Sequence, residues 1–247
     1  MKTITALALI AFGITPALAQ ETTMFQTTAP ALDNYDKAIV KGELWQRPQL
    51  SPRDRSIVTV AALIARNQPT VLSDQVELAL DNGVKPSEIS EILTHLAFYA
   101  GWGNAQAAAP EIAKAFTARN IDISSLPAAK VELNPVNPET EAVRTKAVEN
   151  LTGSASPGLE HFTTNPLFLD LWLRPDLKPR DRSLVTVTSL ISLGQSMQIP
   201  YHLNRAMDNG LTAEEAGEVV THLAFYAGWP NAFSAAPVVR DTVKARP

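Results

Sequence analysis

The chain of 247 residues contains no cysteine, and this absence excludes several kinds of chemistry at once. Disulfides, thiolate zinc sites, iron–sulfur clusters and cysteine nucleophiles all require a sulfhydryl group. Basic residues are slightly outnumbered, with 21 Lys+Arg against 25 Asp+Glu and a net charge of -4. No basic run of nucleic-acid-binding or polybasic membrane type is present. Hydrophobic residues make up 45% and charged residues 19%, which is typical of a globular protein.

The N-terminal segment has the pattern of a secretory signal peptide. Lys2 supplies the positive charge, a short apolar stretch follows, and Ala17-Leu18-Ala19 is a small-x-small cleavage site. The apolar run of about 15 residues is too short for a membrane anchor. We therefore expect residues 1–19 to be removed, and the mature protein to be periplasmic or secreted with no membrane contact.

The rest of the chain contains a tandem sequence repeat, with a constant offset between the two copies. The nine letters THLAFYAGW occur identically in both copies, so chance does not explain the match. The matching blocks are 53–56 with 180–183, 81–83 with 208–210, and 94–102 with 221–229. We predict repeat 1 at 32–120, repeat 2 at 159–247, and a linker at 121–158 that carries a short helix at 139–151.

The periodicity predicts an all-helical protein. Ile57, Val60, Ala61 and Ile64 follow the i, i+3, i+4, i+7 spacing of one apolar helical face. Further helices are expected at 72–82, 86–100 and about 103–119, and no β-hairpin signal is present. Each repeat is too small to bury its helices alone, so we expect the two repeats to pack together as a pseudo-dimer.

These repeated residues resemble the carboxymuconolactone decarboxylase family, within the AhpD-like group. Four motifs of repeat 2 carry the resemblance. They are Arg174-Pro175-x-Leu177, Arg180-x-Arg182-Ser183, His202-Leu-x-x-Ala-x-x-Asn209-Gly210 and His222-Leu-Ala-x-Tyr226-Ala-Gly-Trp229. It implies an all-α fold that assembles into trimers or hexamers. A chain with two repeats would form a homo-oligomer as a trimer.

The redox branch of this family uses a Glu, a Cys-x-x-Cys pair and a following His. The His position is His202, the cysteine positions hold Gln195 and Gln198, and the Glu position falls near Ser183. A dithiol peroxidase mechanism is therefore excluded, because glutamine cannot replace a redox sulfur.

The resemblance implies a lyase that decarboxylates or isomerises a small carboxylated lactone or related carbonyl acid. Such a reaction needs no metal and no organic cofactor, because the lactone carbonyl accepts the electrons. It needs a proton donor, for which histidine is suited, and cations for the carboxylates, for which arginine is suited. We predict His202, His222 and Glu218 as catalytic, with substrate bound by Arg182, Arg180, Ser183, Gln198, Tyr226 and Trp229, and a second site at Arg55, His95 and Glu91.

Structural interpretations stand beside these roles. Asp54 and Asp181 are placed to hold the neighbouring arginines, and Glu218 lies one helical turn from His222, where it would favour the charged imidazole. Thr212 and Glu215 form a capping box, which Lys85 breaks in repeat 1. The repeated Phe, Tyr and Trp side chains either line a pocket or belong to the core, and His161 is expected at the surface.

A second hypothesis is a non-catalytic periplasmic protein that binds a small ligand or serves as a scaffold. Its support is the export signal and Gln75, which replaces the His202 imidazole in repeat 1. Glutamine forms hydrogen bonds but does not act as a proton donor near neutral pH. Both hypotheses share the predicted fold and differ in turnover.

Overall fold

A computed structural model describes residues 24–246, and the predicted signal peptide at residues 1–19 lies outside them. Every regular element in the described part of the chain is a helix, which confirms the all-α prediction. Within residues 24–246 no helix combines the length and the apolar character that crossing a bilayer requires. The chain divides into two compact units, one ending at Glu43 and the other beginning at Leu44.

In the first unit, the described residues 24–43 form short helical segments. The unit contains α1 (Met24–Thr28), α2 (Pro30–Tyr35) and a π-helical segment (Asp36–Lys41). Within it, Lys37 Nζ lies 2.7 Å from Asp33 Oδ2, an i, i+4 ion pair.

The second unit contains the two sets of longer helices. Repeat 1 supplies α3 (Pro52–Ala65), α4 (Leu72–Asp81), α5 (Pro86–Tyr99) and α6 (Trp102–Ala118). Repeat 2 supplies α9 (Pro179–Ser192), α10 (Ile199–Asp208), α11 (Ala213–Tyr226) and α12 (Trp229–Lys244). Each helix of repeat 2 begins at the residue that the constant sequence offset predicts, so the sequence repeat is also a structural repeat.

Glycines at two equivalent positions separate the last two helices of each repeat. Gly101 between α5 and α6 has φ +97°, and Gly228 between α11 and α12 has φ +92°. A side chain is strained in this left-handed region, so glycine is required where the chain turns. Gly101 lies between the helices that the sequence predicted at 86–100 and about 103–119.

The central helices α3 and α9 are buried on all sides. Every residue of α3 from Asp54 to Ala65 is buried, and so is every residue of α9 from Asp181 to Ser192. The predicted single apolar face is therefore too narrow a description, because each of these helices is covered by both repeats. Helix α3 buries mostly apolar side chains, whereas α9 also buries several hydroxyl groups, of which those of Thr188, Ser189 and Ser192 have no hydrogen-bond partner among the described residues.

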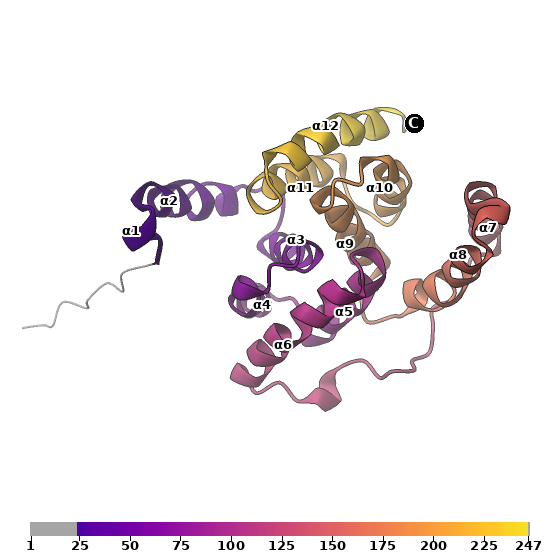
Figure 1. The fold of residues 1–247 in the computed structure, drawn as a ribbon, viewed down its shortest axis with the longest axis horizontal. Helices are drawn as coiled ribbons and strands as arrows, with labels where there is room; N and C mark the ends of the chain where they lie inside the picture. Colours follow the sequence, from indigo (N-terminus) through magenta and orange to yellow (C-terminus); the bar gives the residue numbers. More distant parts are fainter. Residues whose placement is uncertain (1–23, 247) are drawn as a thin grey trace, which may run out of the picture. The chain divides into compact units, whose positions relative to one another are not determined.

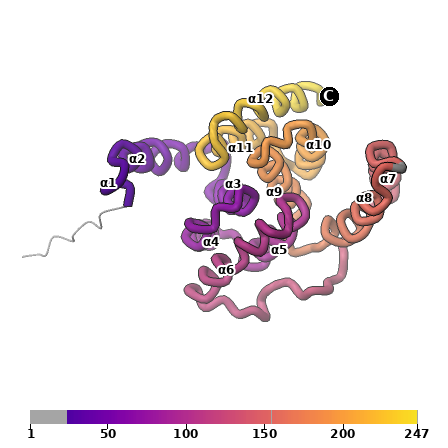
Figure 2. The backbone as a smooth tube through the Cα atoms, in the orientation of Figure 1, coloured from indigo at the N-terminus to yellow at the C-terminus, as the bar shows by residue number. Residues whose placement is uncertain are grey.

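The two repeats exchange partners across α3 and α9. Helix α11 packs against α3, and α5 packs against α9, while α3 and α9 also contact each other. In Figures 1 and 2 these two helices lie between α4–α6 on one side and α10–α12 on the other. This exchange brings the polar residues of α5 and α11 to the central helix of the opposite repeat.

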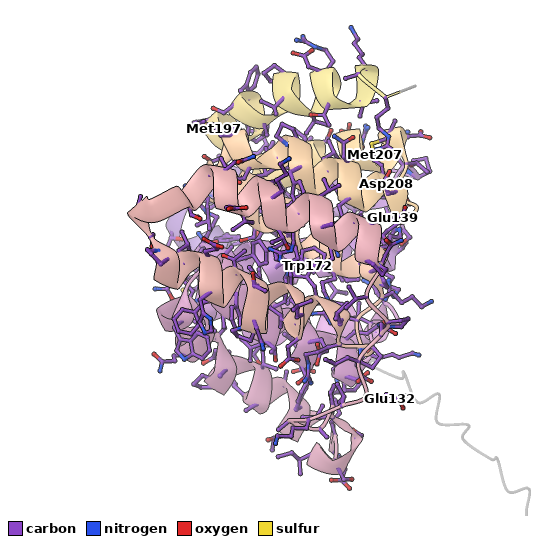
Figure 3. The ribbon with its side chains drawn as sticks, turned by 90° about the vertical axis from the view of Figure 1, so that its right-hand side faces the viewer. Glu132, Glu139, Trp172, Met197, Met207 and Asp208 are labelled. Atoms are coloured by element: carbon purple, nitrogen blue, oxygen red, sulfur yellow. The ribbon has the colours of Figure 1, made fainter. Side chains whose placement is uncertain are left out.

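The linker between the repeats carries one further long helix. Helix α7 (Pro138–Thr152) is followed by α8 (Pro157–Phe162), a π-helical segment (Thr163–Phe168) and a short 3-10 helix (Leu171–Leu173). Asn137 caps α7 by accepting hydrogen bonds from Glu139 N and Thr140 N at 3.0 and 3.1 Å. Figure 3 views the side of the unit where α7 and α8 lie, with Trp172 near the centre.

Candidate functional site

Two equivalent polar clusters lie where the repeats exchange partners. In the α3–α11 cluster, Arg55 Nη2 donates to Glu218 Oε1 at 2.7 Å, and Arg47 donates to both oxygens of the same carboxylate at 2.8 and 2.9 Å. The ring of His222 contacts Arg55 through Nδ1 at 3.4 Å and Thr59 through Nε2 at 2.8 Å. Arg55 and His222 are both 0% exposed, so this cluster is closed to solvent at its centre.

The α9–α5 cluster repeats the arrangement with the roles of the two repeats reversed. Arg182 Nη2 donates to Glu91 Oε2 at 2.9 Å, and Arg174 Nε donates to Glu91 Oε1 at 2.8 Å. His95 contacts Thr186 through Nε2 at 2.7 Å and Arg182 through Nδ1 at 3.5 Å. Each cluster therefore takes its arginines from one repeat and its Glu–His pair from the other.

The hydrogen-bond directions show that both histidines are neutral. A guanidinium can only donate, so Nδ1 of His222 accepts from Arg55 and the ring proton sits on Nε2. That proton is donated to Thr59 Oγ1, whose own proton goes to Arg55 O at 2.9 Å. The same chain runs from Arg182 through His95 to Thr186.

The pKa directions agree with this tautomer. Burial, followed by the charge of Arg55, lowers the pKa of His222 to about 3. Burial and then Arg182 hold the pKa of His95 well below 6.5. The expectation that Glu218 favours a charged His222 is therefore wrong, because the carboxylate is engaged by Arg47 and Arg55, and an arginine faces the ring.

An aromatic wall closes each cluster. Trp172 Nε1 donates to the Tyr99 hydroxyl at 2.9 Å, and Trp45 Nε1 donates to the Tyr226 hydroxyl at 2.9 Å. Tyr99 stacks on His95 with ring centroids 4.7 Å apart, as Tyr226 does on His222. Burial raises the pKa of Tyr99, so its hydroxyl stays protonated at neutral pH.

His202 belongs to the α9–α5 cluster, which separates it from the other predicted catalytic residues. Its ring lies 6.0 Å from Trp172 and 5.4 Å from Tyr99, centroid to centroid. His222 and Glu218 lie in the other cluster with Arg55. The predicted catalytic group is thus divided between two places, and His202 lies instead beside Tyr99 and Trp172, whose rings also contact His95.

His202 differs from the other two histidines in its free ring nitrogen. It is 7% exposed, and its Nδ1 is buried with no hydrogen-bond partner among the described residues. Burial and then the charge of Arg205 lower its pKa to about 4, so it is neutral at pH 7. At the equivalent place in repeat 1, Gln75 Oε1 is likewise buried without a partner among those residues.

Arg180, predicted to bind substrate, instead joins a network of carboxylates with its repeat-1 counterpart Arg53. Arg180 Nη2 donates to Asp54 Oδ2 and Glu215 Oε1, both at 2.8 Å, and Arg53 Nη2 donates to Asp181 Oδ2 at 2.8 Å. Burial alone would lower the pKa of Arg180, but these acids raise it. The structural interpretation of the Arg–Asp pairs therefore holds, with the pairing crossed between repeats.

Glutamates at the starts of α5 and α11 act as caps. Thr212 Oγ1 accepts from Glu215 N at 3.1 Å, and Glu215 Oε2 accepts from Thr212 N at 2.8 Å, which confirms the capping box. In repeat 1, Glu88 Oε2 still accepts from Lys85 N at 2.8 Å. Half of the box thus survives there, because the backbone N–H at the cap does not depend on the residue type.

The other predicted substrate residues do not gather around His202. Ser183 is fully buried and donates to Pro179 O in its own helix, while Gln198 is exposed. Trp229 is 51% exposed and contacts Phe225, as Trp102, 62% exposed, contacts Phe98. Of the aromatic residues in the identical blocks 94–102 and 221–229, only Tyr99 and Tyr226 are part of the two clusters.

A pocket of about 300 Å³ opens beside Trp172 and was missed by the sequence reasoning. Its lining includes Arg205 on α10 and Arg144 on α7, neither of which the family motifs single out. The only sequence signal was that Arg205 lies one turn after His202 on the same helical face. Across residues 24–246, no three or more His, Cys, Asp or Glu side chains are grouped to hold a metal ion.

The fold and these repeated clusters define a tandem helical protein in which each half completes the polar centre of the other. The carboxymuconolactone decarboxylase family matches residues 30–115 and again residues 157–241. The chain belongs to this family.

Two characterised relatives share one repeat's length with the chain. The 4-carboxymuconolactone decarboxylase of Acinetobacter baylyi is 30% identical over 99 residues, which cover 40% of this chain and 73% of that protein. The nitrosuccinic acid decarboxylase of Metarhizium robertsii is 33% identical over 97 residues, which cover 39% of this chain and 67% of that protein. Decarboxylation is thus named for relatives of this chain.

Proposed function

We propose that the protein is a cofactor-independent lyase that decarboxylates or isomerises a small carboxylated lactone or related carbonyl acid at His202. The observation that carries this proposal is the unpartnered Nδ1 of His202. His95 and His222 have both ring nitrogens engaged by protein groups, so neither has a free position for a substrate proton. The names of the two relatives support the reaction class.

The proposed reaction breaks the bond between a carbon and its carboxylate. Carbon dioxide leaves, and the electron pair of that bond passes to the conjugated carbonyl as an enolate. The imidazolium of His202 then delivers a proton to the carbon and later regains one from water. In isomerisation the same ring removes a proton from one carbon and returns it to another.

The low pKa of His202 fits a group that takes up its proton when substrate binds. In the free protein the ring is neutral, because burial and Arg205 disfavour its charge. An anionic substrate beside the ring would oppose Arg205 and raise this pKa, since an opposite charge favours the imidazolium. The substrate would in this way prepare its own proton donor.

Arg182, Glu91 and His95 are assigned a positioning role. Arg182 is 0% exposed and its Nη2 is committed to Glu91 and to Arg174 O, so it cannot bind a substrate carboxylate without breaking a buried ion pair. Breaking such a pair costs about 3–5 kcal/mol. The α3–α11 cluster is closed in the same way and has Gln75 in place of the imidazole, so we assign it to the scaffold.

A non-catalytic ligand-binding protein is the alternative. The observation that favours it is that the glutamate and the histidine of each Arg–Glu–His cluster are held by protein groups, although Nε of Arg55 and Nε of Arg182 are buried with no partner among the described residues. This alternative predicts saturable binding without any conversion of the ligand.

The test is a turnover assay on the chain from Gln20, with carboxylated lactones and keto acids as substrates. Release of carbon dioxide and loss of lactone absorbance are followed for the wild type, for His202→Gln, which copies Gln75, and for His161→Gln as an exposed control. We expect His202→Gln to lower kcat at least 100-fold and His161→Gln to keep it. Turnover that survives His202→Gln, or no turnover with any of these acids, would refute the proposal.

A further inference from the structure

The pocket beside Trp172 is built from parts of the chain that are far apart in sequence. The linker segment 134–137 and α7 form one wall, and the 3-10 helix at Leu171–Leu173 with the end of α10 forms the other. Asn134 N donates to Leu173 O at 2.8 Å, which fixes the linker against the second wall. In Figure 3, Glu139 at the start of α7 and Asp208 at the end of α10 are labelled above and to the right of Trp172.

Arg205 presents an uncommitted guanidinium to this pocket. Its Cζ lies 4.2 Å from the centre of the Trp172 ring and 5.7 Å from that of Phe168. No hydrogen bond or ion pair joins this guanidinium to another described residue, although its planar fork of N–H donors suits a carboxylate. Stacking on Trp172 holds the group in place without using those donors.

The two carboxylates that line the pocket, Glu141 and Asp208, are already paired with other cations. Glu141 accepts from Arg144 Nη2 at 2.6 Å and from Arg144 Nε at 2.8 Å, and Asp208 accepts from Arg246 Nη2 at 2.7 Å. Arg144 also lines this pocket, and its third guanidinium nitrogen, Nη1, is buried with no hydrogen-bond partner among the described residues. The pocket therefore holds more donor capacity than its own acids use.

Arg205 and His202 occur together in only one repeat. They are three residues apart on α10, so they lie on the same helical face and both contact the Trp172 ring. At the equivalent positions of α4, repeat 1 has Leu78 and Gln75. The arginine and the histidine thus occur together in repeat 2, and both are missing from repeat 1.

We propose that Arg205 binds the carboxylate of a small, flat organic acid in this pocket, whose lining includes the Trp172 ring that His202 also contacts. The aromatic rings of Trp172 and Phe168 provide the apolar walls, and the volume of about 300 Å³ suits a single five- or six-membered ring with short substituents. This inference rests on the proposed function only where it calls the acid a substrate. It replaces Arg182 and Arg180 with Arg205 as the residue that binds the carboxylate.

The test measures binding by isothermal titration calorimetry, with turnover left out. The probe is muconolactone, a five-membered lactone with one carboxymethyl group, and its methyl ester serves as the uncharged control. We expect Arg205→Leu, which copies Leu78, to weaken muconolactone binding about 10- to 100-fold. Arg205→Lys should fall between the wild type and Arg205→Leu, because it keeps the charge and loses the fork.

Two further variants serve as controls. One tests for a general effect of removing an arginine, and the other separates binding at Arg205 from the proposed function of His202. Arg240→Leu removes an exposed arginine of α12 and should leave the affinity unchanged. His202→Gln should retain binding within about threefold even if it abolishes turnover. Arg205-dependent binding without turnover would sustain this inference and refute the proposed function.

Three results would overturn the assignment of Arg205. They are equal affinity in the wild type and Arg205→Leu, equal affinity for the acid and its methyl ester, and no saturable binding of muconolactone to the wild type.

Discussion

Acid should destabilise this protein well above the range in which carboxylates titrate, because three of its four histidines are buried and neutral. The folded-state pKa values of His95, His202 and His222 all lie below 6.5, with His202 at about 4 and His222 at about 3. Between pH 7.5 and 5 the unfolded chain binds protons at these residues and the folded chain does not. Stability is therefore complete above pH 6.5 and is lost as the pH falls.

The magnitude at pH 5 follows from the unfolded state alone. An imidazole with a pKa of 6.5 is about 97% protonated at pH 5, and a folded-state pKa of 4 or lower leaves the buried ring almost neutral. The linkage relation then gives a loss of about 2 kcal/mol in the free energy of unfolding for His202 and again for His222. Any folded-state pKa of 4 or below gives nearly the same value.

The assay is urea unfolding followed by far-UV circular dichroism at pH 7.5 and pH 5.0. The His202→Gln variant should lose about 2 kcal/mol of the pH-dependent difference, because its glutamine does not titrate. His161 is exposed, so His161→Gln should keep the whole difference. An unchanged pH dependence in His202→Gln, or a reduced one in His161→Gln, would show that the burial argument is wrong.

Two further predictions concern stability and assembly. Glu218→Gln leaves the buried Arg55 without its carboxylate and should cost about 3–5 kcal/mol in urea unfolding, whereas Glu214→Gln, at an exposed position of the same helix, should change it by less than about 0.5 kcal/mol. A similar loss in both would argue against the buried pair. Light scattering of the chain from Gln20 should give the mass of a trimer, as the family resemblance implies, and a strictly monomeric protein would contradict this.

The helices and their caps could be predicted from the sequence, because they depend on residues that are close together in the chain. The spacing of apolar residues predicted helices at 72–82, 86–100 and about 103–119, and the observed helices begin and end within a few residues of these bounds. Side-chain caps such as Thr212 with Glu215 depend on residues three apart, so the sequence shows them directly. The constant offset between the repeated blocks likewise predicted a second copy of whatever the first copy forms.

The grouping of the site residues could not be predicted from the sequence, because it depends on which repeat each helix packs against. His222 and His202 lie in one repeat, and the sequence places them together, yet α11 packs on α3 and carries His222 to Arg55. The sequence also contains no record of burial, so a Glu one turn from a His predicted a charged imidazole. Burial of the His222 ring, followed by the charge of Arg55, lowers its pKa and reverses that prediction.

The sequence by itself determined the helices, the duplication and the absence of sulfur chemistry, since each of these depends on residue type and short spacing. Only the tertiary structure decided that Glu91 forms an ion pair with Arg182 and that Glu218 forms one with Arg55. It also decided that Arg205, rather than Arg182, lines the pocket beside Trp172. The physical reason is that charge and burial act through space, so a residue's neighbours across the repeat boundary set its protonation and its access to a ligand.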